Sequence, residues 1–100
     1  MTNHDTANKT YNITTLGTTT IPGHWLLVAI IVGVKGASSN IASIYDSTTD
    51  LGTNSDLSRG ILDTVNTLGR VEYGIPMLNG IHIVLSAGTA ANLLVVYRPL

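Results

Sequence analysis

This sequence has no cysteine, few charged residues and no long apolar run. Without cysteine it can form neither a disulfide nor a thiolate metal site. A nucleic-acid-binding face needs clustered cations, and the cations of this chain are scattered, which excludes that class of partner. The five lysines and arginines are Lys9, Lys35, Arg59, Arg70 and Arg98.

The longest apolar run, residues 25–34, is too short for a membrane helix, which needs about 20 residues. The polar N-terminal segment lacks the apolar centre of a signal peptide. We therefore expect no membrane association. The chain is nevertheless 44% hydrophobic over 100 residues, with a formal net charge of −1. This balance indicates one folded domain rather than a disordered chain, with a near-neutral surface that favours self-association.

Residues for catalysis or metal binding are sparse. The three histidines, His4, His24 and His82, lack the spacing of a metal site. His82 alternates with Ile81 and Ile83, which is typical of a strand residue on the less buried face. Neither a glycine-rich phosphate loop nor a nucleophile motif is present. We therefore predict no catalytic, cofactor-binding or metal-binding residue, and no enzyme activity.

Acidic residues gather only in the polar segment 46–56, which holds Asp46, Asp50, Asn54 and Asp56. Their oxygens suit a hard cation, but the spacing does not match the alternating ligands of an EF-hand loop. Asp and Asn also stabilise turns through their own backbone, so we interpret the segment as a solvated loop.

The aromatic residues have two possible roles, which are core packing and contact with a partner or a sugar. We favour core packing. The residues in question are Trp25, Tyr45, Tyr73 and Tyr97; the fifth aromatic residue, Tyr11, lies in the N-terminal segment.

Short apolar and β-branched runs between turns predict an all-β fold. Strands of ordinary length then give six to eight antiparallel strands in a β-sandwich or jelly-roll-like arrangement. Asn79-Gly80 is a strong turn signal, and we expect the last three strands to form an antiparallel meander. A short helical turn over residues 57–65 is an alternative to the third strand. The expected strands are residues 25–34, 41–45, 61–65, 70–75, 81–86 and 93–98.

Residues 1–20 are rich in Thr and Asn, with isolated Tyr11, Ile13 and Leu16. The apolar density is too low for a core of its own. We therefore predict an extended N-terminal arm over residues 1–20 that becomes ordered on a partner, followed by the β-sandwich domain over residues 21–100. A disordered tail is the alternative.

Residues 25–34 are apolar on both faces if they form a strand. A strand of an isolated sandwich normally has one face in water, so we predict that the second face is covered by the arm or another subunit. A buried helix is the alternative. Strict alternation places Leu26, Val28, Ile30, Val32 and Val34 on the covered outer face. With the arm, the candidate interface residues are Tyr11, Ile13, Leu16, Leu26, Val28, Ile30 and Val32.

Several motifs follow one another between residues 23 and 98. They are the apolar strand after Gly23, Ile44-Tyr45-Asp46 before a Ser/Thr loop, Tyr73-Gly74-Ile75-Pro76, Asn79-Gly80-Ile81, Ser86-Ala87-Gly88-Thr89-Ala90 and Val95-Val96-Tyr97-Arg98. This order resembles a group of small virion proteins of tailed bacteriophages. The resemblance implies a β-sandwich structural protein without enzymatic activity or cofactor. The first apolar strand departs from the group's pattern because both its faces are apolar, which favours an oligomer.

From this resemblance we expect a capsid decoration (cement) protein that binds the major capsid protein lattice. It would lie on the capsid surface of the virion, and in the host cytoplasm during assembly. We expect a homo-oligomer, with a trimer favoured because decoration sites commonly lie at local three-fold positions. The alternative is a tail or head–tail adhesion module that binds host surface carbohydrate.

Overall fold

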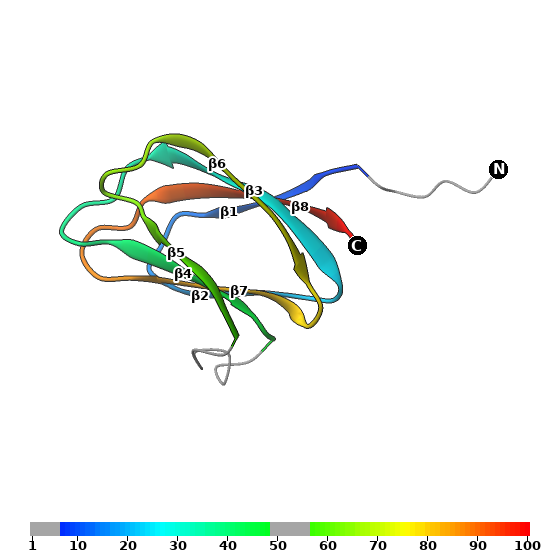
Figure 1. Ribbon diagram of the computed structural model, residues 1–100. Coiled ribbons are helices and arrows are strands. Elements are labelled where there is room, and N and C mark those ends of the chain that lie inside the picture. The colour runs from blue at the N-terminus through cyan, green and yellow to red at the C-terminus, as the bar shows by residue number, and fades with distance from the viewer. Residues whose placement is uncertain (1–6, 49–56) are drawn as a thin grey trace.

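The computed structural model describes residues 7–48 and 57–100 and folds them into eight strands without an α-helix (Figure 1). The prediction of an all-β fold with six to eight antiparallel strands is confirmed. The strands are β1 (Lys9–Ile13), β2 (Gly17–Pro22), β3 (Trp25–Val34), β4 (Ile41–Asp46), β5 (Ser58–Asp63), β6 (Gly69–Met77), β7 (Gly80–Ser86) and β8 (Asn92–Pro99).

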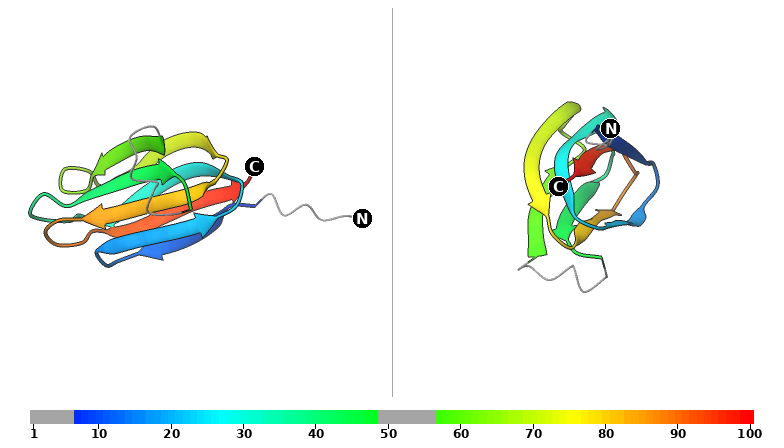
Figure 2. Two further views of the ribbon diagram at one scale, coloured as in Figure 1. Left: turned by 90° about the horizontal axis from the view of Figure 1, so that it is seen from below. Right: turned by 90° about the vertical axis from the view of Figure 1, so that its right-hand side faces the viewer.

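The strands form two four-stranded sheets, which we call sheet A (β1-β8-β3-β6) and sheet B (β2-β7-β4-β5). Figure 2 shows the two layers from two further directions. The pairing is nested, because β1 pairs with β8, β2 with β7, β3 with β6 and β4 with β5. All of these pairs are antiparallel, so the chain follows the course of one long hairpin folded over into two layers.

The meander predicted for the last three strands is wrong. β6 lies in sheet A, β7 in sheet B and β8 in sheet A again, so each turn between them crosses from one sheet to the other. Asn79-Gly80 does mark a turn, as the sequence predicts, but this turn does not close a hairpin. A local turn signal fixes where the chain reverses, whereas the sheet that the next strand joins depends on distant partners.

The predicted N-terminal arm also differs from the structure. Residues 9–13 and 17–22 are β1 and β2, which pair with β8 and β7 of the same chain. Ile13 is only 4% exposed, and it joins Ile21 in the hydrophobic core. Edge strands need few apolar residues, and β-branched Thr favours the extended backbone, so this Thr-rich segment folds with the domain. Residues 1–6 of the predicted arm lie outside the described residues.

β3 contains a bulge that changes which side chains face the core. The register with both of its neighbours shifts between Leu27 and Ala29. Leu27 points into the core before the bulge, and Ile30 and Val32 point into it afterwards. The extra residue of a bulge moves the alternation by one position. The face assignment by strict alternation is therefore wrong, because Ile30 and Val32 lie in the core beside Leu27.

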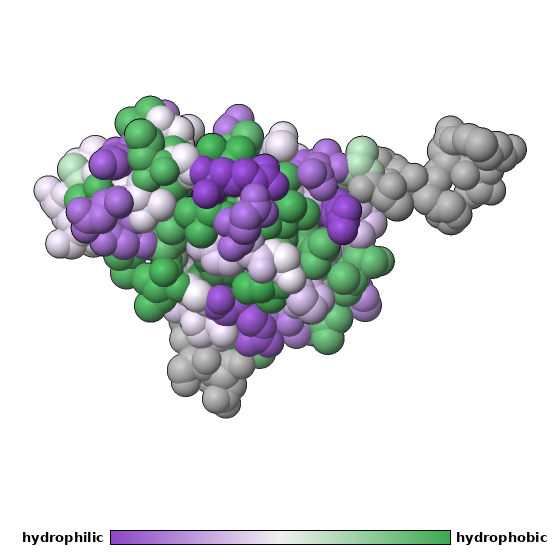
Figure 3. Space-filling model, turned by 45° about the horizontal axis from the view of Figure 1, so that its top comes forward, coloured by the Kyte–Doolittle hydropathy of each residue, from purple (hydrophilic) through white to green (hydrophobic). Residues whose placement is uncertain are grey.

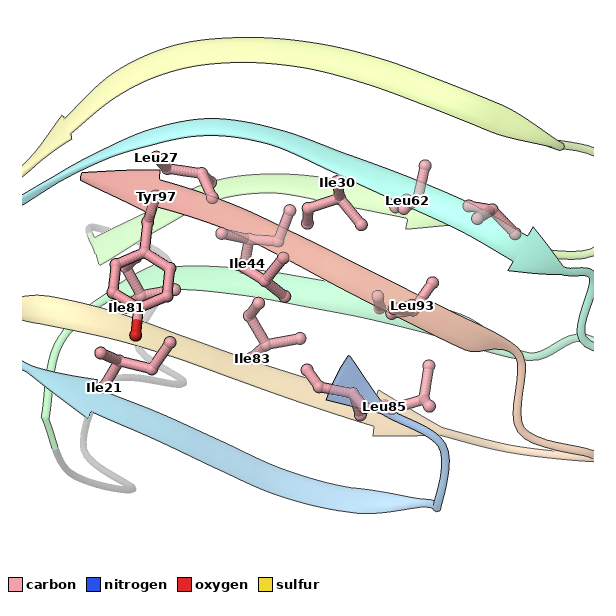
Figure 4. Packing of buried hydrophobic residues seen from close by; sticks show 14 of the residues in the cluster. Ile21, Leu27, Ile30, Ile44, Leu62, Ile81, Ile83, Leu85, Leu93 and Tyr97 are labelled. Carbon is pink, nitrogen blue, oxygen red and sulfur yellow. The ribbon is translucent and has the colours of Figure 1, made fainter. Parts of the chain in front are cut away.

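The core fills the space between the two sheets. Figure 4 shows Ile44, Ile81 and Ile83 of sheet B pointing toward Leu27 and Tyr97 of sheet A. Branched aliphatic side chains from both inner faces account for most of the cluster. This packing is the arrangement expected of two sheets stacked face to face.

Candidate functional site: the outer face of sheet A

The two central strands of sheet A carry apolar side chains on their outer face. On β8, Leu94 and Val96 alternate with core residues and so point outward. On β3, Ala29 and Ile31 pair with Val96 and Leu94 respectively, which places all four on the same side. Leu26 precedes the bulge and lies on this side too. We call Leu26, Ala29, Ile31, Leu94 and Val96 the outer stripe.

The outer stripe is only partly covered within the chain. Leu26, Ile31 and Leu94 are half-buried, whereas Ala29 and Val96 are buried. Val28, which lies at the bulge, is also half-buried and stands outside the core cluster.

Polar residues border the outer stripe on both edge strands. On β1, Thr10 and Asn12 pair with Val96 and Leu94. On β6, Arg70 and Glu72 pair with Ile31 and Ala29 and form an ion pair with each other. Figure 3, in which the sheet A side comes forward, shows hydrophilic groups next to broad hydrophobic surface.

Arg98 stands at one end of the outer stripe, opposite Leu26. It is exposed, and no ion pair involving it occurs among residues 7–48 and 57–100. An apolar centre with a polar, arginine-containing border is the usual composition of a protein–protein contact surface.

The outer face of sheet B is different because polar side chains interrupt it. Its central strands present Ser43 and Tyr45 on β4, and His82 and Val84 on β7. His82 is on the outer face, as the sequence suggests, yet it is only 1% exposed. Its Nδ1 lies 3.0 Å from Thr20 Oγ1, and its ring lies edge-on to Tyr45. Its buried Nε2 has no hydrogen-bond partner in the described part of the chain.

The sequence-predicted interface residues fall into two groups in the structure. Tyr11 and Leu16 are 47% and 48% exposed, and Leu26 and Val28 are half-buried. The remaining three are core residues whose side chains are covered by their own chain. These are Ile13, Ile30 and Val32.

Asp46 holds the turn between β6 and β7, a role that sequence reasoning missed. Its carboxylate accepts hydrogen bonds from the backbone N–H groups of Leu78, Asn79 and Gly80, at 3.2, 2.8 and 3.4 Å. Arg59 lies 3.6 Å from the same carboxylate. We call these five residues the Asp46 cluster. Asp46 is buried, and a buried carboxylate is costly unless it is paired. The three backbone N–H groups and the Arg59 guanidinium offset that cost.

The cation site considered for the segment 46–56 cannot be described as a whole, because Asp50, Asn54 and Asp56 lie outside the described residues. Asp46 itself faces the β6–β7 turn. Residues 7–48 and 57–100 contain no group of three or more His, Asp or Glu side chains placed to hold a metal ion.

A second buried polar cluster joins the loops at the opposite end of the sandwich. Asn40 Nδ2 donates to the carbonyl oxygens of Ser86 and Ala87, at 3.2 and 2.9 Å. Asn40 Oδ1 accepts from Thr64 Oγ1 at 2.6 Å and from the Ala91 N–H at 3.2 Å. We call these five residues the Asn40 cluster. The side chain of Asn40 therefore links the β3–β4, β5–β6 and β7–β8 connections.

Of Trp25, Tyr45, Tyr73 and Tyr97, all but Tyr45 pack in or against the core, which agrees with the favoured interpretation. Trp25 and Tyr97 pack edge-to-face with ring centroids 4.9 Å apart. Tyr73 packs against the core, and its burial raises the pKa of its hydroxyl. Tyr45 is the exception, because it lies on the outer face of sheet B and is not part of the core cluster.

The described residues enclose no pocket and form no helix that is long and apolar enough to cross a membrane. No known protein-family model matches this chain, and no curated protein matches it in sequence. Among the described residues, the outer stripe with its polar border is the candidate contact surface.

Proposed function

We propose that this protein is a structural component of a virion, most specifically a capsid decoration protein that binds the major capsid protein lattice. The observation that carries the proposal is the nested strand order, β1-β8-β3-β6 over β2-β7-β4-β5. Eight strands in two sheets with this order form a jelly roll, an architecture used by viral capsid proteins and by lectins. This support is an analogy at the level of the fold, and it agrees with the sequence resemblance.

The surface supports a passive binding role. On sheet A, the outer stripe offers apolar area, and Arg70, Glu72 and Arg98 offer charges at its border. Burial of apolar surface yields roughly 25 cal/mol per Å², from which the entropy lost on association must be subtracted. A repeated lattice of partner subunits suits a sheet face of this composition, and the mechanism needs neither catalysis nor a cofactor.

We also propose that the protein is a homo-oligomer, with a trimer favoured, on the capsid surface. The trimer follows from the resemblance and from the threefold positions that decoration proteins occupy. Tyr11 and Leu16, both exposed on the N-terminal strands and their connection, are the remaining candidates for contacts between copies. Light scattering on the purified protein measures this directly, and a monomer at high concentration would contradict it.

The binding proposal is tested on particles of the virus whose genome encodes the chain, stripped of this protein and then mixed with purified variants. Leu94→Asp introduces a charge into the outer stripe. Val84→Asp is the matched control, because Val84 is also half-buried and outward-facing on a central strand, but on sheet B. We expect Leu94→Asp to lose binding and Val84→Asp to retain it, with both variants folded by circular dichroism.

Equal binding by the two variants would contradict a role for sheet A. Immunogold labelling of intact particles then shows whether the protein lies on the heads or on the tails. Label on heads supports decoration, whereas label confined to tail tips favours the adhesion module that binds host carbohydrate.

A further inference from the structure

The β6–β7 turn contains a reactive sequence, Asn79-Gly80. In such a pair the backbone nitrogen of the glycine, after losing its proton, attacks the side-chain carbonyl carbon of the asparagine. A new carbon–nitrogen bond closes a succinimide ring, and the side-chain nitrogen leaves as ammonia. One water molecule then opens the ring at either carbonyl and gives aspartate or isoaspartate. Glycine permits this attack best because it has no side chain to obstruct the nitrogen.

In the folded protein, the attacking nitrogen is held by the Asp46 cluster. The Gly80 N–H donates to Asp46 Oδ1 at 3.4 Å, and the Asn79 N–H donates to the same oxygen at 2.8 Å. The Asn79 side chain is held as well, because its Nδ2 donates to the Asp46 carbonyl oxygen at 3.4 Å. The carboxylate favours the protonated nitrogen, and ring closure requires the deprotonated one.

The backbone around Gly80 is also closely packed. Gly80 is buried with a φ of 152°, and a Cβ atom there would lie 2.9 Å from the Ile21 carbonyl oxygen and 3.0 Å from that of Ser47. The nitrogen of Gly80 therefore has little room to move toward the Asn79 side chain while the turn is in place. Ring closure has to wait for the turn to open.

We propose that Asn79 is a site of spontaneous deamidation and that the Asp46 carboxylate restrains the reaction in the folded protein. The site needs no enzyme, and water is the only co-reactant. The exposed side chain of Asn79 leaves the ring-opening step accessible to water.

The product would weaken the turn that restrained the reaction. Aspartate at position 79 places an oxygen where Nδ2 now donates to the Asp46 carbonyl, and adds a second carboxylate beside the buried one. Isoaspartate also lengthens the backbone by one methylene between two sheets. Either product loosens the crossing from β6 to β7.

The experiment incubates the purified chain in mildly alkaline buffer, folded and in denaturant, and follows residue 79 by peptide mass spectrometry. Asn79 and Asn92 fall on the same tryptic peptide, since no Lys or Arg lies between Arg70 and Arg98. Asn92 precedes Leu93 and so provides an internal control that should stay unmodified. We expect deamidation of Asn79 to be about tenfold slower or more in the folded chain, because the turn must open first.

Asp46→Asn removes the charge and one of the two acceptor oxygens. We expect the folded variant to deamidate at Asn79 faster than the folded wild type, by at least half of the difference between folded and denatured wild type. Asp63→Asn is its control, because it removes an exposed carboxylate that does not contact the turn. A folded Asp46→Asn chain that reacts no faster than wild type would overturn the proposal. The wild-type comparison needs no variant, and equal rates in the folded and denatured chain would overturn it as well.

Discussion

Ile13→Ala tests most directly whether β1 is part of the folded domain, because Ile13 is the residue of β1 that lies in the core. Ile13 is 4% exposed and pairs with Leu93 on the inner side of sheet A. The substitution removes three carbon atoms, and each buried methylene contributes about 0.8 kcal/mol, which gives about 2.4 kcal/mol. The cavity adds to this loss, although an edge strand can partly close it, so we expect a total of about 2.5–3.5 kcal/mol.

The assay is equilibrium unfolding in urea, followed by the fluorescence of Trp25, the single tryptophan of the chain. Trp25 packs against Tyr97, so its emission reports the closed sandwich. Ile61→Ala is the matched control, because Ile61 is the same residue type on the outer face of β5 and is 67% exposed. We expect the control to change the free energy of unfolding by less than about 0.5 kcal/mol.

The result discriminates between a strand of the domain and an extended arm. If residues 9–13 were an arm that becomes ordered only on a partner, Ile13→Ala would leave the isolated domain as stable as Ile61→Ala does. A loss of about 0.5 kcal/mol or less for Ile13→Ala would therefore refute the placement of β1. A loss near the expected value corresponds to a melting temperature lower by roughly 10–25 °C.

Three further predictions concern residues in the connections between strands. Asn40→Ala should lower the free energy of unfolding by about 3 kcal/mol, since it leaves several buried donors and acceptors without partners. Ala87→Gly should raise it by about 0.5–1 kcal/mol, because Ala87 has a φ of 68° that glycine adopts without strain; a decrease in urea-measured stability would contradict this. Asn66→Ala should raise the pKa of Asp63 in an NMR titration, because the Asn66 side chain is the largest cause of its lowered pKa. The stability that Asp63 contributes is present above its ordinary pKa and lost as pH falls through the lowered one, so Asn66→Ala should reduce that acid-side loss; an unchanged Asp63 titration would contradict the assignment.

The existence of the strands was predictable from the sequence because it depends on local properties. Runs of Val, Ile and Leu between Gly- and Asn-containing turns predict strands close to β3, β4, β6, β7 and β8. β5 begins three residues before its predicted start, and the sequence predicts an arm where the structure has β1 and β2. Those two strands are edge strands with one core residue each, Ile13 and Ile21, which leaves little periodic signal in the sequence.

The pairing of the strands was not predictable, because distant side chains decide it. Asn79-Gly80 has the same local signal in a hairpin and in a crossing between sheets. The carboxylate that holds this turn comes from Asp46, more than thirty residues earlier in the chain. Likewise, Asn40 contacts Ser86, Ala87 and Ala91 across more than forty residues. In the sequence, both residues look like ordinary loop residues.

The bulge in β3 changes which substitution tests the covered outer face. The apolar run 25–34 predicts a covered face, and strict alternation places Ile30 on it. Because the register shifts between Leu27 and Ala29, Ile30 lies in the core, and a charge placed there would unfold the protein whether or not a partner exists. Ile31 points outward beside Leu94 of β8, so Ile31→Asp is the informative change. An apolar outer face that needs a cover is therefore still expected, but it is made by residues of both β3 and β8, and the run 25–34 contains only those of β3.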